Sequence, residues 1–274
     1  MSGKLVLCGT PIGNLEDASP RLIRALREAD AIACEDTRRT RKLLTHFGVE
    51  GRRLFVYNDT NERKQAPKLV ELVAQGRVLA LVSDAGMPGL SDPGYHLVRA
   101  CIERELRIEV VPGPSAVVTA LALSGFTGSR FVFEGFLPRR KAEKERRIAE
   151  LSDERRTIVI FESPPRLLGT LNALVAGLSE RRAVVARELT KLHEEVMRGT
   201  LTELAGSVSQ ETPRGELVIV VEGAPGASAA VSPDELAERA RALMGQGVAR
   251  KDALTRVARE MGVPRRAVFD ALIE

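Results

Sequence analysis

Short apolar runs alternate with amphipathic stretches through the first part of the chain, and this alternation constrains the fold more than any other feature. The runs are rich in Val, Ile, Leu and Ala and lie at residues 4–9, 31–35, 54–57, 77–83 and 107–111. Continuous apolar strands separated by helices are typical of a largely parallel sheet that helices cover on both faces. We therefore predict an N-terminal α/β domain over residues 1–114.

Capping residues indicate where helices begin and end in this domain. Ser19 and Pro20 fit the N-cap and the first position of a helix. The pair at 36–37 can cap a second helix, and Gly48 fits the position after its end. Further helices are expected over residues 62–75 and 94–105.

Residues 115–224 predict a second α/β domain of about equal size, with more antiparallel pairing. A helix is expected over 115–123, another starts at 164–165, and Thr200 can cap a short third one. Residues 139–156 read as a polar, charged stretch. The expected strands lie at residues 131–136, 157–162, 183–187, 195–199 and 216–222.

The last part of the chain is a helical extension over residues 233–274. The segment before it, 223–232, consists mostly of small residues, which is typical of a linker. Gly262 breaks one helix and Pro264 starts the next, so the pattern resembles a helix-turn-helix. We expect a helical cap on the second domain; the alternative is a unit that grips RNA or a ribosomal protein.

Three loops rich in Gly and Pro each follow a predicted strand. Because the carboxyl ends of parallel strands meet at one edge of a sheet, the loops should outline a single ligand pocket. None contains a Walker A or GxGxxG motif, which argues against a nucleotide kinase or an ordinary dinucleotide enzyme. The loops are GTPIGN (9–14), SDAGMPGLSDPG (83–94) and PGPSA (112–116).

Composition helps to decide whether the chain is a membrane, secreted, metal-binding or nucleic-acid-binding protein. No apolar run approaches the ~20 residues of a membrane span and no secretory signal is evident, so we expect a cytoplasmic protein. Cys8, Cys34 and Cys101 lack ligand spacing, so we expect neither a metal nor a disulfide. The net charge of +4 permits an anionic partner, although 4% aromatic residues offer few platforms for stacked bases.

A series of segments between about residues 4 and 222 carries a family resemblance. They are GTPIGNLED, ACEDTRRTRKLL, VSDAGMPGLSDPGYHLV, VVPGPSAVVTAL, FEGFLPR, FESPPRL and ARELTKLHEE. In this order they resemble the motifs of the ribosomal small-subunit RNA methyltransferase I family, within the tetrapyrrole-methylase-like group. The GTPIGN and SDAGMPG–DPG loops are shared with cobalamin-pathway methylases, whereas EDTRRT, FLPR, ESPPR and ARELTK are more specific to the ribosomal RNA branch.

This resemblance implies an S-adenosylmethionine-dependent enzyme with its active site in the cleft between two α/β domains. Its substrate would be 16S rRNA or the assembled small ribosomal subunit, methylated on the ribose 2′-hydroxyl of a cytidine near the decoding centre. The resemblance also suggests a homodimer. For Asp84, a role in holding the loop is an equal alternative to cofactor binding. The cofactor walls would come from Pro11, Asp84, Ala85, Gly86, Ser115, Ala116 and Leu137.

A ribose hydroxyl is a poor nucleophile, so a base or a cation should assist its deprotonation. Glu188 or Asp36 is the expected base, with Lys191 or Arg38 positioning a phosphate or lowering the pKa of the hydroxyl. The alternative role of Asp36 is a helix N-cap. The alternative for Glu188 and Lys191 is a surface ion pair.

Basic residues gather in segments that we expect to face RNA. Arg39 and Arg41 share one short helix, and Arg139 and Arg140 begin the charged stretch. Arg166 could hold a phosphate with two nitrogens or simply begin a helix in solvent. Two other functions stay open: methylation of a small tetrapyrrole, and non-enzymatic nucleic-acid binding through the helical extension.

Overall fold

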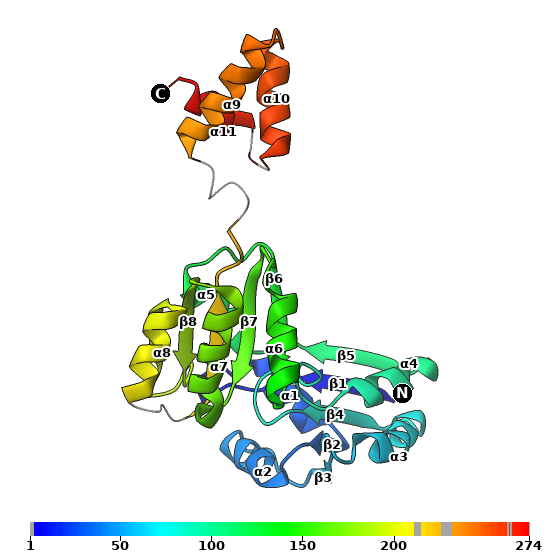
Figure 1. The fold of residues 1–274 in the computed structure, drawn as a ribbon. Coiled ribbons are helices and arrows are strands. Elements are labelled where there is room, and N and C mark those ends of the chain that lie inside the picture. Colours follow the sequence, from blue (N-terminus) through cyan, green and yellow to red (C-terminus); the bar gives the residue numbers. More distant parts are fainter. Residues whose placement is uncertain (1–2, 211–214, 226–231, 262, 264, 274) are drawn as a thin grey trace.

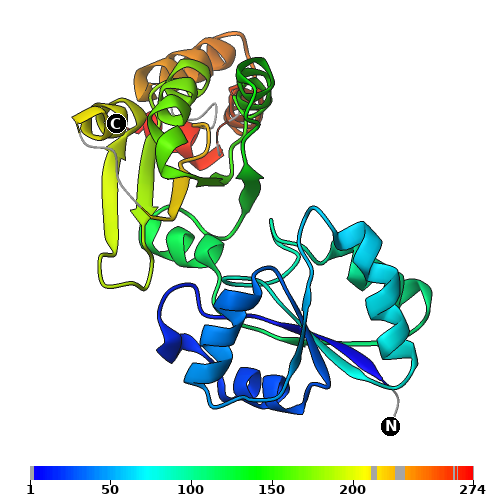
Figure 2. The same ribbon diagram turned by 90° about the horizontal axis from the view of Figure 1, so that it is seen from below.

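The computed structural model describes residues 3–210, 215–225, 232–261, 263 and 265–273. Within these ranges the strands form two five-stranded sheets, and a group of helices follows them (Figure 1). The two sheets form separate lobes when the molecule is seen from below (Figure 2). The predicted α/β fold with two sheets is confirmed.

The first sheet has the strand order β3-β2-β4-β1-β5, and its strands all pair in parallel. Two hydrophobic clusters, one on each face, bury these strands, which explains their continuous apolar sequences. The strands are β1 (Lys4–Cys8), β2 (Ala31–Cys34), β3 (Arg53–Val56), β4 (Val78–Val82) and β5 (Arg107–Val111). The helices are η1 (Leu15–Asp17), α1 (Pro20–Glu28), α2 (Thr37–His46), α3 (Glu62–Ala74) and α4 (Tyr95–Glu103).

The predicted caps form as expected. The Ser19 hydroxyl accepts the backbone N–H of Leu22 at 3.1 Å, and the Asp36 carboxylate accepts the backbone N–H of Arg38 at 2.7 Å. Gly48 follows the end of α2 with a φ of +59°, a left-handed conformation that favours glycine. The cap at Asp36 fixes where α2 begins, directly beside the carboxyl edge of the sheet.

The second sheet has the order β6-β7-β10-β8-β9. Among the described pairs of this sheet, only β6 and β7 are parallel, and the others are antiparallel. Helices α6, α7 and α8 supply the core on one face, and α5 packs on the other. The strands are β6 (Phe131–Phe136), β7 (Thr157–Glu162), β8 (Arg182–Arg187), β9 (Glu195–Thr200) and β10 (Leu217–Val221). The helices are α5 (Ala116–Ser124), α6 (Lys141–Glu150), α7 (Pro164–Leu178) and α8 (Leu201–Gln210).

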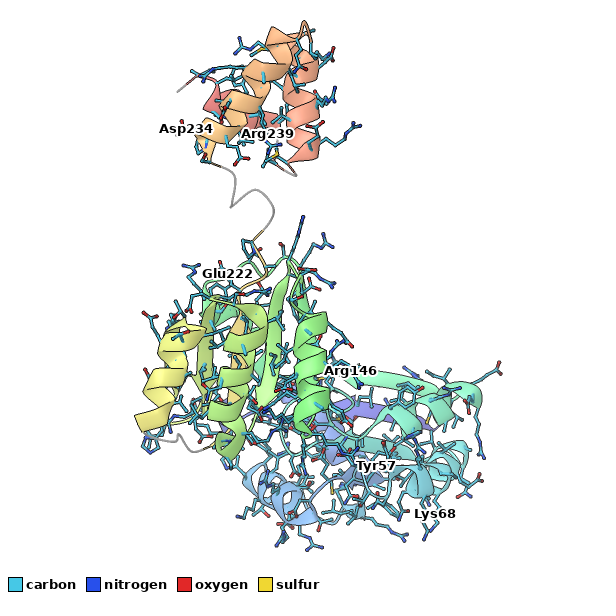
Figure 3. The ribbon with its side chains drawn as sticks, viewed as in Figure 1. Tyr57, Lys68, Arg146, Glu222, Asp234 and Arg239 are labelled. Atoms are coloured by element: carbon cyan, nitrogen blue, oxygen red, sulfur yellow. The ribbon has the colours of Figure 1, made fainter. Side chains whose placement is uncertain are left out.

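Helices α9 (Pro233–Gly245), α10 (Arg250–Glu260) and α11 (Arg265–Ala271) pack around a core of their own. This core is separate from that of the second sheet, and the expected cap on the second domain stays a prediction. Figure 3 shows Asp234 and Arg239 on this unit, apart from Glu222 near the end of β10. Residues 226–231 of the predicted linker lie outside the described residues. No helix in the described ranges is long and apolar enough to cross a bilayer.

Candidate active site

The three glycine-rich loops interlock at the carboxyl edge of the first sheet. Thr10 and Gly86 exchange backbone hydrogen bonds of 2.9 and 3.1 Å. Gly9 and Gly113 approach so closely that a Cβ on either would lie 2.6 Å from backbone atoms of the other. Glycine is therefore required at both positions, because any side chain would push the loops apart.

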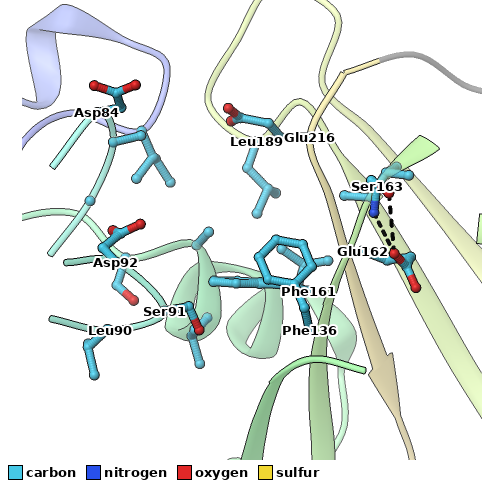
Figure 4. Close-up of a pocket in the computed structure, with 18 of the residues that line it drawn as sticks. Asp84, Leu90, Ser91, Asp92, Phe136, Phe161, Glu162, Ser163, Leu189 and Glu216 are labelled. Carbon is cyan, nitrogen blue, oxygen red and sulfur yellow. Dashed lines mark hydrogen bonds between the residues drawn. The ribbon is translucent and has the colours of Figure 1, made fainter. Parts of the chain in front are cut away.

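A cleft of about 360 Å³ opens between these loops and the second sheet, within the ~300–1,000 Å³ typical of small-molecule sites. In Figure 4, Asp84 and Asp92 lie on one side of the cleft, and Glu216 and Phe161 lie on the other. The cleft lining includes Ile12, Glu35, Arg39, Asp84, Ala85, Gly86, Asp92, Ser115, Ala116, Phe136, Phe161, Glu162, Leu189, Glu216 and Val218.

Most of the predicted cofactor residues lie at this cleft. Ala85, Gly86, Ser115 and Ala116 line it directly, and Pro11 lines a groove next to it. Leu137 does not line either one: it is 2% exposed, in the core of the second sheet. The family resemblance implied a place for Leu137 in the cofactor wall, whereas its side chain belongs to the hydrophobic cluster formed with α6 and α7.

Asp84 connects the cleft to helix α2. One carboxylate oxygen accepts the backbone N–H of Asp36 at 3.2 Å, and the other pairs with the guanidinium of Arg39 at 3.3 Å. Asp84 therefore fixes the loop after β4 against the start of α2, and still lines the cleft. Both roles weighed from the sequence, loop support and ligand contact, suit its position.

Glu35 is not among the residues that the sequence singles out as a base, yet its pKa is raised further than that of Asp92, which also lines the cleft. Its Oε1 is shielded from solvent and has no hydrogen-bond partner in the described structure. Burial, followed by repulsion from Asp92, Asp84 and Asp59, raises the pKa of Glu35 to about 8. Burial likewise raises the pKa of Asp92 to about 6. Glu35 is therefore poised to exchange a proton near neutral pH.

Asp36, the neighbouring residue proposed as a base, has the opposite character. Its carboxylate caps α2 and also pairs with the Arg38 guanidinium at 2.9 Å. Hydrogen bonds from the side chain and backbone of Arg38 lower the pKa of Asp36 to about 2. A carboxylate stabilised to this extent is a weak base. Asp36 and Arg38 thus form an ion pair and a capping hydrogen bond at the start of α2.

Glu188 and Lys191 lie in the loop between β8 and β9, partly buried. The Lys191 ammonium bridges Glu188 at 2.8 Å and Glu216 at 3.1 Å. Burial raises the pKa of Glu188, but hydrogen bonds from Lys191 and the Glu216 backbone outweigh it and lower the pKa below the ordinary value. These residues form an ion-pair network rather than an isolated base.

The same loop joins the two halves of the molecule. Glu188 and Thr190 adopt left-handed φ values of +51° and +67°, which are strained for side chains of this kind. The Thr190 hydroxyl accepts the backbone N–H of Asn14 at 3.2 Å, and a Cβ on Gly13 would lie 2.4 Å from the Lys191 side chain. The strained loop therefore packs directly on the first glycine-rich loop.

A groove beside the cleft brings basic residues to its edge. Arg39 lines both, and Lys42 and Lys191 line the groove. The predicted RNA contacts Arg41, Arg139 and Arg140 are exposed on the surface. Arg39, Lys42 and Lys191 therefore place positive charge at the edge of the cleft, which favours an anionic partner there.

Arg166 points into the protein, contrary to the expected phosphate contact. Its guanidinium pairs with the fully buried Glu162 at 3.2 Å and donates to the Leu137 carbonyl at 2.6 Å. Glu162 also accepts the Thr170 hydroxyl at 2.6 Å. Arg166 therefore holds the segment after β6 against α7. Helical position could not reveal this, because the partners come from other elements.

Sequence reasoning also missed the aromatic residues of the cleft. The rings of Phe136 and Phe161 lie 5.6 Å apart and line one wall. Phe136 is 54% exposed, an unusual position for a large apolar side chain. The motifs FEGFLPR and FESPPRL contain both residues, but only the strand pairing brings them together.

Comparisons with known proteins agree with this architecture. The chain matches the family of tetrapyrrole (corrin/porphyrin) methylases over residues 4–205. It is 46% identical to the ribosomal RNA small subunit methyltransferase I of Thermotoga maritima over 81% of this chain and 99% of that protein. The Synechocystis sp. protein of the same name is 42% identical over 99% of this chain and 98% of its own. The chain belongs to the ribosomal RNA small subunit methyltransferase I family.

Solved structures show the fold of this methyltransferase I family member. The methyltransferase CobJ superposes with a TM-score of 0.62 at 20% identity, covering 82% of this chain and 96% of that one. Diphthine synthase superposes with a TM-score of 0.59 at 16% identity, over 80% and 90% of the two chains. At this identity the likeness concerns the fold alone.

The cofactor of this methyltransferase I family member is S-adenosylmethionine, and the cleft fits it. The cofactor carries a sulfonium and an ammonium against one carboxylate. Carboxyl groups outnumber cations along the cleft, with Glu35, Asp84 and Asp92 near Arg39. Phe136 and Phe161 offer faces to a flat adenine ring. No group of three or more His, Cys, Asp or Glu in the described residues is placed to hold a metal ion.

Proposed function

We propose that this methyltransferase modifies the ribose 2′-hydroxyl of a cytidine in 16S ribosomal RNA, near the decoding centre. The observation that carries the proposal is the shared wall between the acidic cleft and the basic groove: Arg39 and Asp84 line both. The acidic side suits a cationic methyl donor, and the groove with Lys42 and Lys191 suits a phosphate backbone. The names of the relatives at 40–46% identity support RNA as the substrate.

The chain's own residues would align the reacting groups. The donor, when bound, supplies a methyl group on a good leaving group, so alignment is the main requirement. Ala85, Gly86, Ser115 and Ala116 would hold it by backbone and small side chains. The cations of the groove would fix the target nucleotide. The hydrogen bond between Thr190 and Asn14 would hold the two sides of the cleft in a fixed relative position.

Of the two other functions considered, neither is favoured by a specific observation. The tetrapyrrole enzymes among the solved structures share about 20% identity with this chain, which supports the fold and not their substrates. A purely nucleic-acid-binding role leaves the cleft without a purpose. We further propose that the protein acts in the cytoplasm, where ribosomal subunits are found, and that it is a homodimer.

The direct test uses purified protein, methyl-labelled S-adenosylmethionine and small ribosomal subunits from a strain that lacks the activity. We expect label at one ribose 2′-oxygen of the 16S RNA, located by mapping ribose methylation along the chain. Free 16S RNA in a parallel reaction tells whether the assembled subunit is required. Absence of label on both RNAs, with donor binding intact by calorimetry, would reject RNA as the substrate.

A further inference from the structure

Glu35 lies at the carboxyl end of β2, the second strand of the first sheet, and lines the cleft. Its Oε1 is shielded from solvent and receives no hydrogen bond, which is costly for a carboxylate but tolerable for a carboxylic acid. The proposed function leaves this carboxyl group without an assigned role.

Charged groups from three segments of the first domain influence Glu35 electrostatically. Asp84 and Asp92 come from the loop after β4, Asp59 from the loop after β3, and Arg39 from α2. Asp84 is already engaged with Arg39 and the Asp36 backbone. The negative charges outnumber the cation among these groups, so the protonated form of Glu35 is favoured in the free protein, and a positive charge in the cleft would favour its carboxylate. These contacts account for the direction in which its pKa is raised.

We propose that Glu35 is the proton acceptor of the methyl transfer: it holds a proton in the free protein, releases it when the cationic methyl donor enters, and then takes the proton of the attacking hydroxyl. This role rests on the proposed function. The hydroxyl oxygen forms a bond to the methyl carbon, the carbon–sulfur bond breaks with its electron pair left on sulfur, and the hydroxyl proton passes to the Glu35 carboxylate. Charge and atoms balance, with one proton gained by Glu35.

The first half of the proposal is measured without RNA. Donor binding is followed by calorimetry at pH 8 in two buffers of different ionisation enthalpy, which counts the protons released. Asp92 is ionised at this pH, whereas Glu35 is about half protonated. The donor's own α-amino group titrates at ~7.7–8.0, so Glu35→Gln is the matched control. The variant replaces an unpartnered oxygen with an isosteric amide and should fold.

We expect the wild-type protein to release about half a proton more than Glu35→Gln, because the cation favours the carboxylate. Equal proton counts in the two proteins would overturn the proposal. This result is independent of the RNA substrate. A wild-type protein that labels no ribose would therefore reject the proposed function, while the proton count would still decide whether Glu35 titrates with the donor.

The second half is measured on small subunits with saturating donor. Glu35→Gln should lower kcat by ~10²–10⁴ and leave the affinity for the subunit unchanged, as expected for loss of a general base. Asp92→Asn should move the acidic limb of the kcat profile to lower pH, because removal of a negative neighbour lowers the pKa of Glu35. A Glu35→Gln enzyme within tenfold of wild type, or loss of kcat in Asp36→Asn or Glu188→Gln instead, would overturn the assignment.

Discussion

Gly86 lines the cleft with a left-handed φ of +81°, and its amide and carbonyl groups pair with Thr10. A Cβ at this position would meet Ile12 Cγ2 at 3.4 Å. Gly89, three residues later, has nearly the same φ, +84°, but a Cβ there would meet nothing within 4 Å. Substitutions at both glycines carry the same conformational cost, and only the substitution at Gly86 would also affect the cleft.

We predict that Gly86→Val and Gly89→Val each lower the free energy of unfolding by about 1–2 kcal/mol, the cost of a left-handed side chain. Only Gly86→Val should weaken S-adenosylmethionine binding, by at least about tenfold (~1.4 kcal/mol), because its methyl groups enter the cleft. Urea unfolding and calorimetry measure the two quantities. Wild-type donor affinity in Gly86→Val would remove Gly86 from the cofactor site.

Neighbouring residues 35 and 36 mark the limit of what the sequence could predict at this scale. The segment was identified because charged residues follow an apolar strand. The choice between Glu35 and Asp36 depends on carboxylates that arrive much later in the chain, at Asp84 and Asp92. Their effect requires the side-chain positions of the folded protein.

Elements were predictable where one physical pattern controlled them. Continuous apolar runs located the strands, and caps such as Ser19 located helix starts. The sequence of helix α6 indicates only a charged stretch, because Ile148 is its single buried residue and ion pairs such as Arg140–Glu143 occupy its surface. Contacts between elements were not predictable from local sequence, and Arg166 is the clearest case.

Arg166 joins α7 to the segment after β6, so its removal should act on stability. We predict that Arg166→Ala lowers the free energy of unfolding by about 2 kcal/mol, because the buried Glu162 loses its cation but keeps Thr170 and the Ser163 N–H. Arg140→Ala, which removes an exposed pair, should cost at most about 1 kcal/mol. Urea titrations of both variants provide the comparison.

The affinity of the same two variants for RNA provides the control for these stability measurements. Arg140→Ala should weaken binding to small subunits, and the loss should shrink at high salt. Arg166→Ala should bind as wild type once its folded fraction is taken into account. If Arg166→Ala keeps wild-type stability but loses RNA affinity, its internal contacts are incidental and the original phosphate role returns.

For the whole molecule, the separate core of α9–α11 raises the question of what the unit contributes. The Thermotoga maritima relative matches this chain over 99% of its own length but only 81% of this one, so about a fifth of this chain has no counterpart there. Removing residues 230–274 should therefore leave S-adenosylmethionine affinity within about twofold of wild type, since none of the described residues beyond 218 lines the cleft.

The same truncation should weaken binding to the small subunit by about tenfold or more, because Arg250, Lys251, Arg259 and Arg265 are lost with it. Filter binding at two salt concentrations, alongside donor calorimetry, tests both statements. Equal losses of donor and subunit binding would show that the unit supports the fold rather than the RNA contact. No loss of either would exclude it from substrate recognition.

Strand order also fixes the time at which this protein becomes complete during synthesis. The first sheet can close once β5 has emerged, whereas β10, which fills the gap between β7 and β8, is the last strand of its sheet to be made. Until then β7 and β8 present open hydrogen-bonding edges to the nascent chain's surroundings. Residues 215–218 of the cleft arrive with β10, so the lining of the cleft is complete only when β10 joins the second sheet.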